Sequence, residues 1–279
     1  KSLVLQIRGE IQQILEKKDT DIHEVPHSIF YELRDSPALP ATEKTVQRLE
    51  DEATLLVMAG LLPDQRSNLN IVRTDEKKPC TESTAKSITI AHYYLIANPH
   101  IIAKLRTELS TKPSTTLADL DQLPYLHAIA LEANRLSFGL TGRNPRVSPD
   151  TALQYTNPSS RSTYVIPVGT PVSTSTLLAH TNEDVFPDPW TFDPGRWLGP
   201  EGQERKKYMI AFGKGPRQCI GMNLANAELL STIAEMAKWE MAFFETSEKD
   251  VKFLHDYHVA TPRLDSLGVK VKVLKRLEL

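Results

Sequence analysis

The amino-acid sequence predicts a mainly α-helical fold with small antiparallel β elements. Apolar residues recur at helical spacing through most of residues 1–137. Closely spaced prolines then divide residues 140–200 into short β-like runs and an irregular meander. One more long helix follows, and two alternating segments near 240–246 and 267–274 are expected to pair as a terminal hairpin.

The composition is that of a globular protein. Of its 279 residues, 40% are hydrophobic and 24% are charged, which excludes wholesale disorder, collagen-like repeats and coiled coil. The formal charge of −2 provides no net positive field, so no nucleic-acid partner is expected. Two cysteines, Cys80 and Cys219, are too few for a disulfide-stapled secreted fold. The longest apolar run, 53–62, is about half as long as a bilayer crossing needs.

Three helical segments are predicted in the first 60 residues. The first covers residues 1–18, and its single apolar stripe consists of Leu3, Ile7, Ile11 and Leu15. Prolines mark the following loop, which contains a short helical piece at 29–33. The third helix begins near Thr42, a good N-cap residue, and extends over residues 42–60.

Residues 61–80 interrupt this pattern and read as a loop, because they contain two prolines and little apolar periodicity. Helix resumes over 81–98, and another helix begins at Pro99, a residue suited to a first helical turn. Residues 117–120 form at most one turn. A strong helix is predicted over 124–137, and the last long helix over 220–239.

The most informative segment is residues 212–221, which read Phe-Gly-Lys-Gly-Pro-Arg-Gln-Cys-Ile-Gly. Cys219 stands just before the predicted last helix, where backbone N–H groups and the helix dipole stabilise a thiolate. Gly213 and Gly215 permit tight turns and the close approach of a flat ligand. Arg217 offers a cation for a carboxylate. A thiolate and a carboxylate-binding arginine around a glycine turn fit a haem, with the sulfur on the iron and Arg217 on a propionate.

The same segment matches the pattern F-x-x-G-x-R-x-C-x-G at every fixed position, and it resembles the cytochrome P450 (haem-thiolate monooxygenase) superfamily. The resemblance implies that Cys219 is the metal ligand of haem b. It also implies that Phe212, Gly213, Arg217 and Gly221 contribute to haem binding.

Two further motifs occur in the order that the family has them. Glu132 and Arg135 resemble the E-x-x-R pair of its K helix, and at i, i+3 the two side chains share a helix face. Residues 192–197, Phe-Asp-Pro-Gly-Arg-Trp, resemble its meander motif, with Gly195 where glutamate is common. By this resemblance, Arg196 completes a structural Arg–Glu–Arg cluster.

The resemblance also points to residues around the ligands. Arg146 stands where family members often place a second propionate ligand, and Arg143 is the rival candidate. Residues 137–144 and the tip of the terminal hairpin are expected to face substrate.

The proton-delivery motif of the family's I helix, A-G-x-[DE]-[TS]-[TS], is split here. Ala59 and Gly60 precede the loop, and Thr81-Glu82-Ser83-Thr84 follows it. The resemblance makes Glu82 the acid, Ser83 the alcohol and Thr84 its neighbour. We hypothesise that residues 61–80 come from an unspliced intron or a mispredicted exon edge, which a transcript without those codons would support.

The resemblance therefore identifies residues 1–279 as the C-terminal portion of a cytochrome P450 domain. It assigns 42–60 and 81–98 to the interrupted I helix, 124–137 to the K helix, 212–221 to the haem-binding loop and 220–239 to the L helix. The full-length parent is expected in the endoplasmic reticulum membrane, and no anchor is expected in this chain.

The expected activity is monooxygenation of a small apolar substrate, such as a terpenoid or other secondary metabolite. Dioxygen and electrons from NADPH-cytochrome reductase would be required, and fungal microsomal members look most similar. Two alternatives stay open: a truncated, non-catalytic fragment with an interrupted I helix, and a haem-thiolate isomerase or dehydratase. A purely structural role, with Cys219 buried and inert, predicts no haem uptake.

Overall fold

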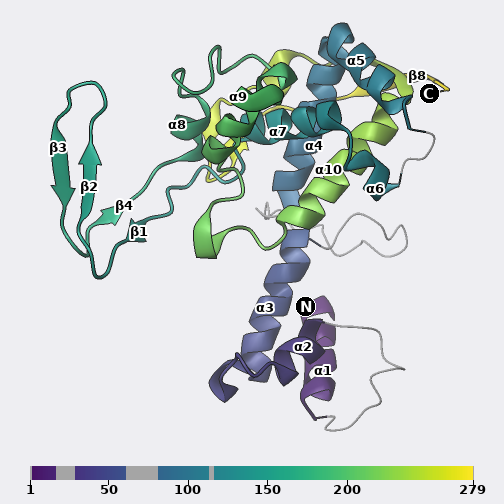
Figure 1. Cartoon of the computed structure of the whole chain (residues 1–279). Helices are drawn as coiled ribbons and strands as arrows, with labels where there is room; N and C mark the ends of the chain where they lie inside the picture. The colour runs from purple at the N-terminus through teal and green to yellow at the C-terminus, as the bar shows by residue number, and fades with distance from the viewer. Residues whose placement is uncertain (1, 17–28, 61–80, 113–115, 279) are drawn as a thin grey trace. The chain divides into compact units, whose positions relative to one another are not determined.

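The computed structural model describes residues 2–16, 29–60, 81–112 and 116–278, which form two compact units, residues 1–81 and 82–279 (Figure 1). The sequence-predicted loop 61–80, with Cys80, lies outside the described residues. None of the helices in the described ranges combines the length and apolarity that a membrane crossing requires.

The first unit is helical. It contains α1 (Ser2–Glu16), α2 (Ile29–Asp35), a 3₁₀ turn η1 (Ala41–Glu43) and α3 (Val46–Gly60). Helices α1 and α3 bury Ile11 against Leu49 and Ala53, and Leu15 packs against them, so the described part of the predicted apolar stripe faces a core; the side chains of Leu3 and Ile7 lie outside the described residues. The predicted N-cap Thr42 is wrong, because it lies within η1. Thr45 takes that role instead, and its Oγ1 accepts a hydrogen bond of 3.2 Å from the Arg48 backbone N–H.

The second unit is built around five helices: α4 (Thr81–Ala97), α5 (Pro99–Leu109), α6 (Leu117–Leu120), α7 (Pro124–Ser137) and α10 (Met222–Ala237). Their buried faces form one core, which includes Ala91, Leu105, Leu126, Ile129 and Ile233. The N-terminus of α7 is fixed by the Glu108 carboxylate of α5, which accepts hydrogen bonds of 2.8 Å from the backbone N–H groups of Tyr125 and Leu126. Helix α7 is therefore held at its first turn and along one face.

Helix α10 is shorter than predicted at both ends. Gly221 is its N-cap, so Ile220 and Gly221 lie in a turn before the helix. At the other end, Arg106 of α5 donates hydrogen bonds to the carbonyl of Ala237 at 2.8 Å and to that of Trp239 at 3.0 Å. The helix ends there because Trp239 already begins a strand.

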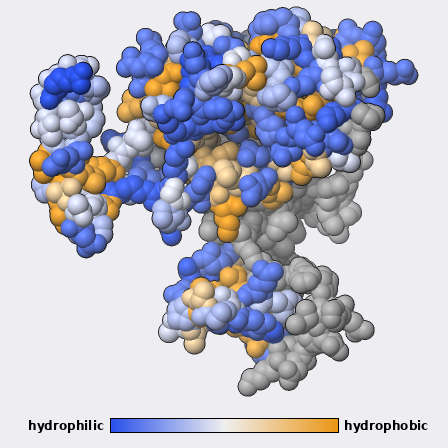
Figure 2. All heavy atoms as spheres, viewed as in Figure 1, coloured by the Kyte–Doolittle hydropathy of each residue, from blue (hydrophilic) through white to orange (hydrophobic). Residues whose placement is uncertain are grey.

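Within the described residues, the strands form four two-stranded antiparallel sheets. These are β1 (Arg146–Val147) with β4 (Pro171–Val172), β2 (Leu153–Thr156) with β3 (Thr163–Ile166), β5 (Trp239–Phe243) with β8 (Val271–Arg276), and β6 (His255–Asp256) with β7 (Ala260–Thr261). The β5–β8 pair confirms the predicted terminal hairpin, and β6–β7 forms a smaller hairpin inside it. The β2–β3 hairpin extends away from the helices (Figure 1). Figure 2 shows apolar side chains on the surface of this region, where Val147, Leu153, Val165 and Val168 are exposed.

Short helical pieces fill the predicted meander and the loops around it. They are α8 (Thr176–His180), η2 (Pro194–Trp197), α9 (Gly199–Arg205), η3 (Lys206–Tyr208), η4 (Gly215–Arg217) and η5 (Glu248–Asp250). Helix α9 lies so close to the end of η2 that a Cβ on Gly202 would stand 2.1 Å from the Trp197 carbonyl carbon. Only glycine therefore fits there.

Candidate functional site

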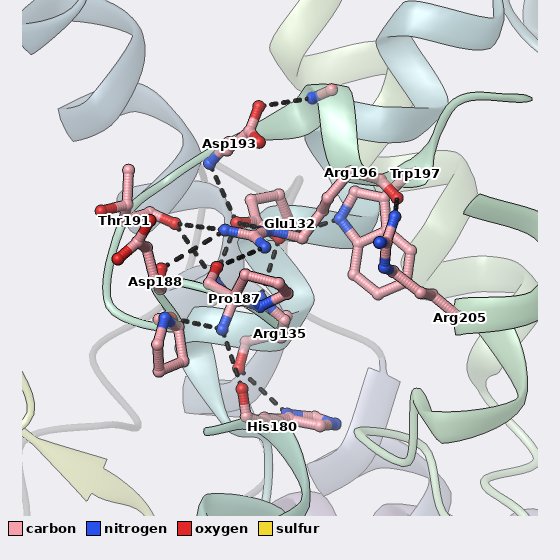
Figure 3. Close-up of polar contacts among 12 residues, drawn as sticks. Glu132, Arg135, His180, Pro187, Asp188, Thr191, Asp193, Arg196, Trp197 and Arg205 are labelled. Atoms are coloured by element: carbon pink, nitrogen blue, oxygen red, sulfur yellow. Dashed lines mark hydrogen bonds and ion pairs between the residues drawn. The ribbon is translucent and has the colours of Figure 1, made fainter. Parts of the chain in front are cut away.

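A buried ion cluster joins α7 to the meander (Figure 3). Glu132 and Arg135 lie on one face of α7 at 0% exposure, and Arg135 donates from Nε to Oε2 at 2.9 Å and from Nη2 to Oε1 at 2.8 Å. Arg196 of η2 donates from Nε to the same carboxylate at 3.0 Å. The predicted Arg–Glu–Arg cluster is confirmed.

The Glu132 carboxylate also accepts hydrogen bonds from two groups of the meander. The Trp197 indole N–H donates at 2.8 Å, and the Asp193 backbone N–H at 3.0 Å. The guanidinium groups direct their remaining N–H groups at backbone carbonyls, those of His180, Pro187, Asp188, Pro189 and Thr191. One carboxylate thus neutralises two buried cations only in part, and the carbonyl dipoles of the meander compensate the rest.

The cysteine loop, residues 210–221, folds back on itself through backbone hydrogen bonds. The Cys219 N–H donates to the Phe212 carbonyl at 2.8 Å, and the Gly213 N–H donates to the Ile210 carbonyl at 2.9 Å. Gly213 at φ +69° and Gly215 at φ +75° occupy the left-handed region that the turns require. The loop therefore has a defined backbone that fixes where Cys219 stands.

The Cys219 thiol is exposed, and two residues, Ile220 and Gly221, separate the cysteine from the start of α10 at Met222. The Met222 N–H donates to the Cys219 carbonyl at 3.4 Å, which ties the cysteine to the helix start. Beside it, Ile220 is 81% exposed and Leu224 is half exposed. A thiol among exposed apolar side chains differs from the inert buried cysteine of the structural alternative.

One predicted propionate ligand, Arg217, lies in this loop, and another, Arg146, contacts it from outside. Arg217 ends η4 within it and is exposed. Arg146 of β1 is exposed too, and it donates from Nη2 to the Lys214 carbonyl at 3.5 Å, so the structure brings it to the loop. The rival candidate, Arg143, is exposed as well. The assignment of Arg146 to a propionate stays a prediction.

Segments that are distant in the sequence meet at the N-terminal half of α4. Lys86 donates from Nζ to the Ala260 carbonyl of β7 at 2.5 Å, and Ser87 donates to the Ser137 hydroxyl of α7 at 2.8 Å. Glu82, Ser83 and Thr84 occupy the turn of α4 just before these residues, and Ser83 and Thr84 are half-buried. The side chain of Glu82 lies outside the described part of the structure, so the proton-delivery role of these three residues stays a prediction.

The chain after α7 pairs with the turn of the β6–β7 hairpin. Leu140 forms a β-bridge with Val259, and the Thr141 N–H donates to the His258 carbonyl at 3.0 Å. The Thr141 hydroxyl donates to Asp256 in a short hydrogen bond. The sequence left the tip of the terminal hairpin undefined, and the structure defines the part that meets residues 139–142 as residues 256–260.

A sequence model described as "Cytochrome P450" matches residues 80–248, more than half of the chain. The chain belongs to the cytochrome P450 family. It is 34% identical over 283 residues to the cytochrome P450 monooxygenase TRI4 of Trichoderma arundinaceum, covering 96% of this chain and 49% of that protein. It is 37% identical over 243 residues to the cytochrome P450 monooxygenase pbrB of Penicillium brasilianum, covering 84% of this chain and 42% of that protein.

The solved structure of a retinoic acid-bound cyanobacterial P450, CYP120A1, has the same fold. The TM-score is 0.65 at 19% identity, with 97% of this chain and 56% of that chain covered. The chain thus spans about half the length of its curated relatives and of this P450. Both comparisons agree with the sequence-based assignment to the C-terminal portion of the fold.

The P450 family implies a haem cofactor, and the cysteine loop fits one. A flat, largely apolar group with carboxylates needs an accessible sulfur, apolar neighbours and cations. The loop supplies the Cys219 thiol, the exposed side chain of Ile220, and the guanidinium groups of Arg217 and Arg146. Phe212 and Gly221 are half-buried within the same turn.

Sequence analysis assigned no role to two buried histidines, His92 and His180. Burial lowers the pKa of His92 on α4 to about 4. The pKa of His180 at the end of α8 is likewise lowered to about 4, chiefly by burial and further by the Arg135 cation. Both imidazoles are therefore neutral at pH 7. His180 contacts both α7 and the chain entering the cysteine loop, whereas His92 packs against the backbone of α10 at Thr232.

Proposed function

We propose that the protein is a haem-thiolate monooxygenase that inserts one atom of dioxygen into a small apolar organic substrate. A terpenoid or another secondary metabolite is the class we favour, since the relatives compared are fungal cytochrome P450 monooxygenases. The observation that carries the proposal is an exposed cysteine in a backbone-defined loop whose sequence matches the haem-binding pattern of the family.

Haem b with a cysteine thiolate ligand supplies the chemistry of dioxygen activation, because the thiolate pushes electron density that favours O–O cleavage. Cys219 Sγ holds the iron in this proposal. Phe212, Gly213 and Gly221 shape the surface against the porphyrin, and Arg217 and Arg146 bind its two carboxylates. The protein otherwise orients the cofactor and excludes water from it.

With haem bound, the residues of the first turn of α4 would hold and pass on the protons that the reaction needs. In the proposal, the Glu82 carboxyl is the acid and the Ser83 hydroxyl passes its proton on, with Thr84 as the neighbouring alcohol. The next turn of α4 supports this assignment, since Lys86 and Ser87 contact β7 and α7. Residues 139–142 and 256–260, which pair beside that turn, form the substrate-facing wall in this proposal.

Electrons come from NADPH-cytochrome reductase, and the full-length protein resides in the endoplasmic reticulum membrane. Both parts of the proposal rest on the resemblance to fungal microsomal members of the cytochrome P450 family. Anaerobic product analysis separates the proposed monooxygenase from a haem-thiolate isomerase or dehydratase, because only the latter forms product without dioxygen.

The carbon monoxide difference spectrum of the haem-loaded, dithionite-reduced chain tests the proposal. We expect a red-shifted Soret band typical of thiolate ligation, lost in Cys219→Ala. Cys80→Ala is the matched control, because it removes the only other cysteine and should leave the band unchanged. Absence of the band in the unmodified chain, or its survival in Cys219→Ala, would contradict the proposal, and the former would favour the non-catalytic fragment.

A further inference from the structure

We propose that His180 is a positioning residue that ties the cysteine loop to the buried Glu132–Arg135 pair. Its two ring nitrogens bind backbone groups of different elements, one at the end of α7 and one at the start of the loop. The role toward haem rests on the proposed function, whereas the role in ordering the loop belongs to the chain itself.

The hydrogen bonds of the His180 ring determine its tautomer. Nδ1 lies 3.0 Å from the Arg135 carbonyl oxygen (Figure 3), and Nε2 lies 3.1 Å from the Ile210 backbone nitrogen. A carbonyl can only accept and an amide N–H can only donate. The proton is therefore assigned to Nδ1, and Nε2 accepts from Ile210.

The imidazole is held rigidly between these partners. His180 is 0% exposed, and its carbonyl accepts from Arg135 Nη1 at 2.9 Å, so histidine and arginine are joined twice. The Phe138 ring stacks at 6.2 Å and the Phe186 ring lies edge-on at 6.4 Å. The His180 ring therefore has little rotational freedom, and the position of its Nε2 depends on the position of the buried Glu132–Arg135 pair.

From Ile210, backbone contacts lead directly to the cysteine. The Ile210 carbonyl accepts from Gly213, and the Phe212 carbonyl accepts from Cys219. The intervening Ala211 carbonyl packs against the chain leaving α7, where a Cβ on Gly139 would stand only 2.7 Å from it. The His180 side chain therefore fixes the first residue of the cysteine loop, Ile210, through the backbone N–H of that residue.

Protonation would destroy this arrangement. An imidazolium has N–H groups at both nitrogens, so Nε2 would face the Ile210 N–H without accepting from it. It would also add a second cation beside Arg135. Burial and that cation lower the pKa of His180 to about 4, which keeps the acceptor available at neutral pH.

Two isosteric substitutions separate the two hydrogen bonds. In His180→Gln the side-chain oxygen reaches the place of Nε2 and keeps the acceptor for Ile210. In His180→Asn the amide reaches only the place of Nδ1, so it keeps the bond to Arg135 and loses the one to Ile210. A residue that merely fills the core would tolerate both changes, or neither, to the same degree.

The first measurement is hydrogen exchange of the Ile210 amide in the full chain without haem. We expect exchange to accelerate about tenfold in His180→Asn, as for the loss of one buried hydrogen bond, and to stay within about twofold of the unmodified chain in His180→Gln. Equal exchange in the two variants would overturn the proposal.

The second measurement is the carbon monoxide difference spectrum of the haem-loaded variants at matched folded fractions. We expect His180→Gln to keep the thiolate-type band and His180→Asn to lose at least about half of it to a band without thiolate, since the loop and Cys219 shift together. A band equally retained in both variants would overturn the role toward haem. If the unmodified chain shows no such band, the proposed function fails, and the exchange experiment still decides whether His180 orders the loop.

Discussion

The Glu132→Gln substitution probes the buried cluster most severely. The carboxylate accepts three hydrogen bonds on Oε1, from Arg135, Arg196 and the Asp193 backbone. It accepts two on Oε2, from Arg135 and Trp197. Glutamine has the same shape but one oxygen, so its best orientation keeps the Oε1 set and turns an NH₂ group toward two donors.

The expected cost is about 4 kcal/mol. The two lost bonds, from the Arg135 guanidinium and the Trp197 indole, are both charge-assisted because the acceptor is a carboxylate, and each loss leaves a buried donor without an acceptor. The substitution also removes the negative charge that faces two buried guanidinium groups, and breaking such a pair typically costs about 3–5 kcal/mol. Because a domain is stable by only about 5–15 kcal/mol, the loss removes between about a quarter and four fifths of the stability expected for the unit of residues 82–279.

Urea denaturation followed by far-UV circular dichroism measures this cost. The matched control is Glu201→Gln, whose carboxylate pairs with Arg205 at 3.1 Å but is 83% exposed, and a loss below about 0.5 kcal/mol is expected. Trp197→Phe removes a single donor from Oε2 and should cost about 1–2 kcal/mol, which keeps the series measurable if Glu132→Gln does not fold. A Glu132→Gln cost within about 1 kcal/mol of the Glu201→Gln control would refute the reasoning.

Three further outcomes are expected. In urea denaturation, Gly139→Ala should lower the free energy of unfolding by more than about 2 kcal/mol, because residue 139 has φ +57° and its Cβ would meet the Ala211 carbonyl. The control Gly169→Ala, at φ +79° with open space around it, should cost only about 1 kcal/mol. Equal costs of the two substitutions would contradict the role of the Ala211 contact. The pKa values of His92 and His180 are lowered to about 4, so the unfolded chain binds more protons than the folded chain between pH 6.5 and 4. The free energy of unfolding from urea denaturation should therefore be highest above about pH 6.5 and fall as the pH drops toward 4, by up to about 3 kcal/mol for each histidine. A free energy that stays constant over this window would exclude neutral buried imidazoles. Deleting residues 61–80 joins α3 directly to α4 and should tighten haem uptake in a titration; weaker uptake would count against the hypothesis that these residues interrupt a functional helix.

Local sequence patterns predicted the elements whose signal lies within a few residues. Helix α7 begins at Pro124 and ends at Ser137 as predicted, because a first-turn proline and a regular apolar stripe both lie within that stretch. Thr42 failed as an N-cap because two threonines compete within four residues, and only the 3₁₀ turn decides between them.

Contacts to the backbone of distant segments could not be predicted. His180 binds groups 45 residues before it and 30 residues after it, and both are main-chain atoms that carry no residue-specific signal. The Arg–Glu–Arg cluster could be predicted only from the resemblance to the cytochrome P450 family, because spacing alone cannot relate Arg196 to Glu132 across 64 residues. The roles of Glu82, Ser83 and Thr84 stay predictions, because they rest on the family resemblance and the side chain of Glu82 lies outside the described residues.

Low-temperature electron paramagnetic resonance of the ferric, haem-loaded chain tests most directly whether Cys219 holds the iron. We predict a low-spin signal typical of thiolate ligation in the unmodified chain, retained in Cys80→Ala and lost in Cys219→Ser. A signal typical of histidine ligation in the unmodified chain, or a thiolate signal that persists in Cys219→Ser, would contradict that assignment.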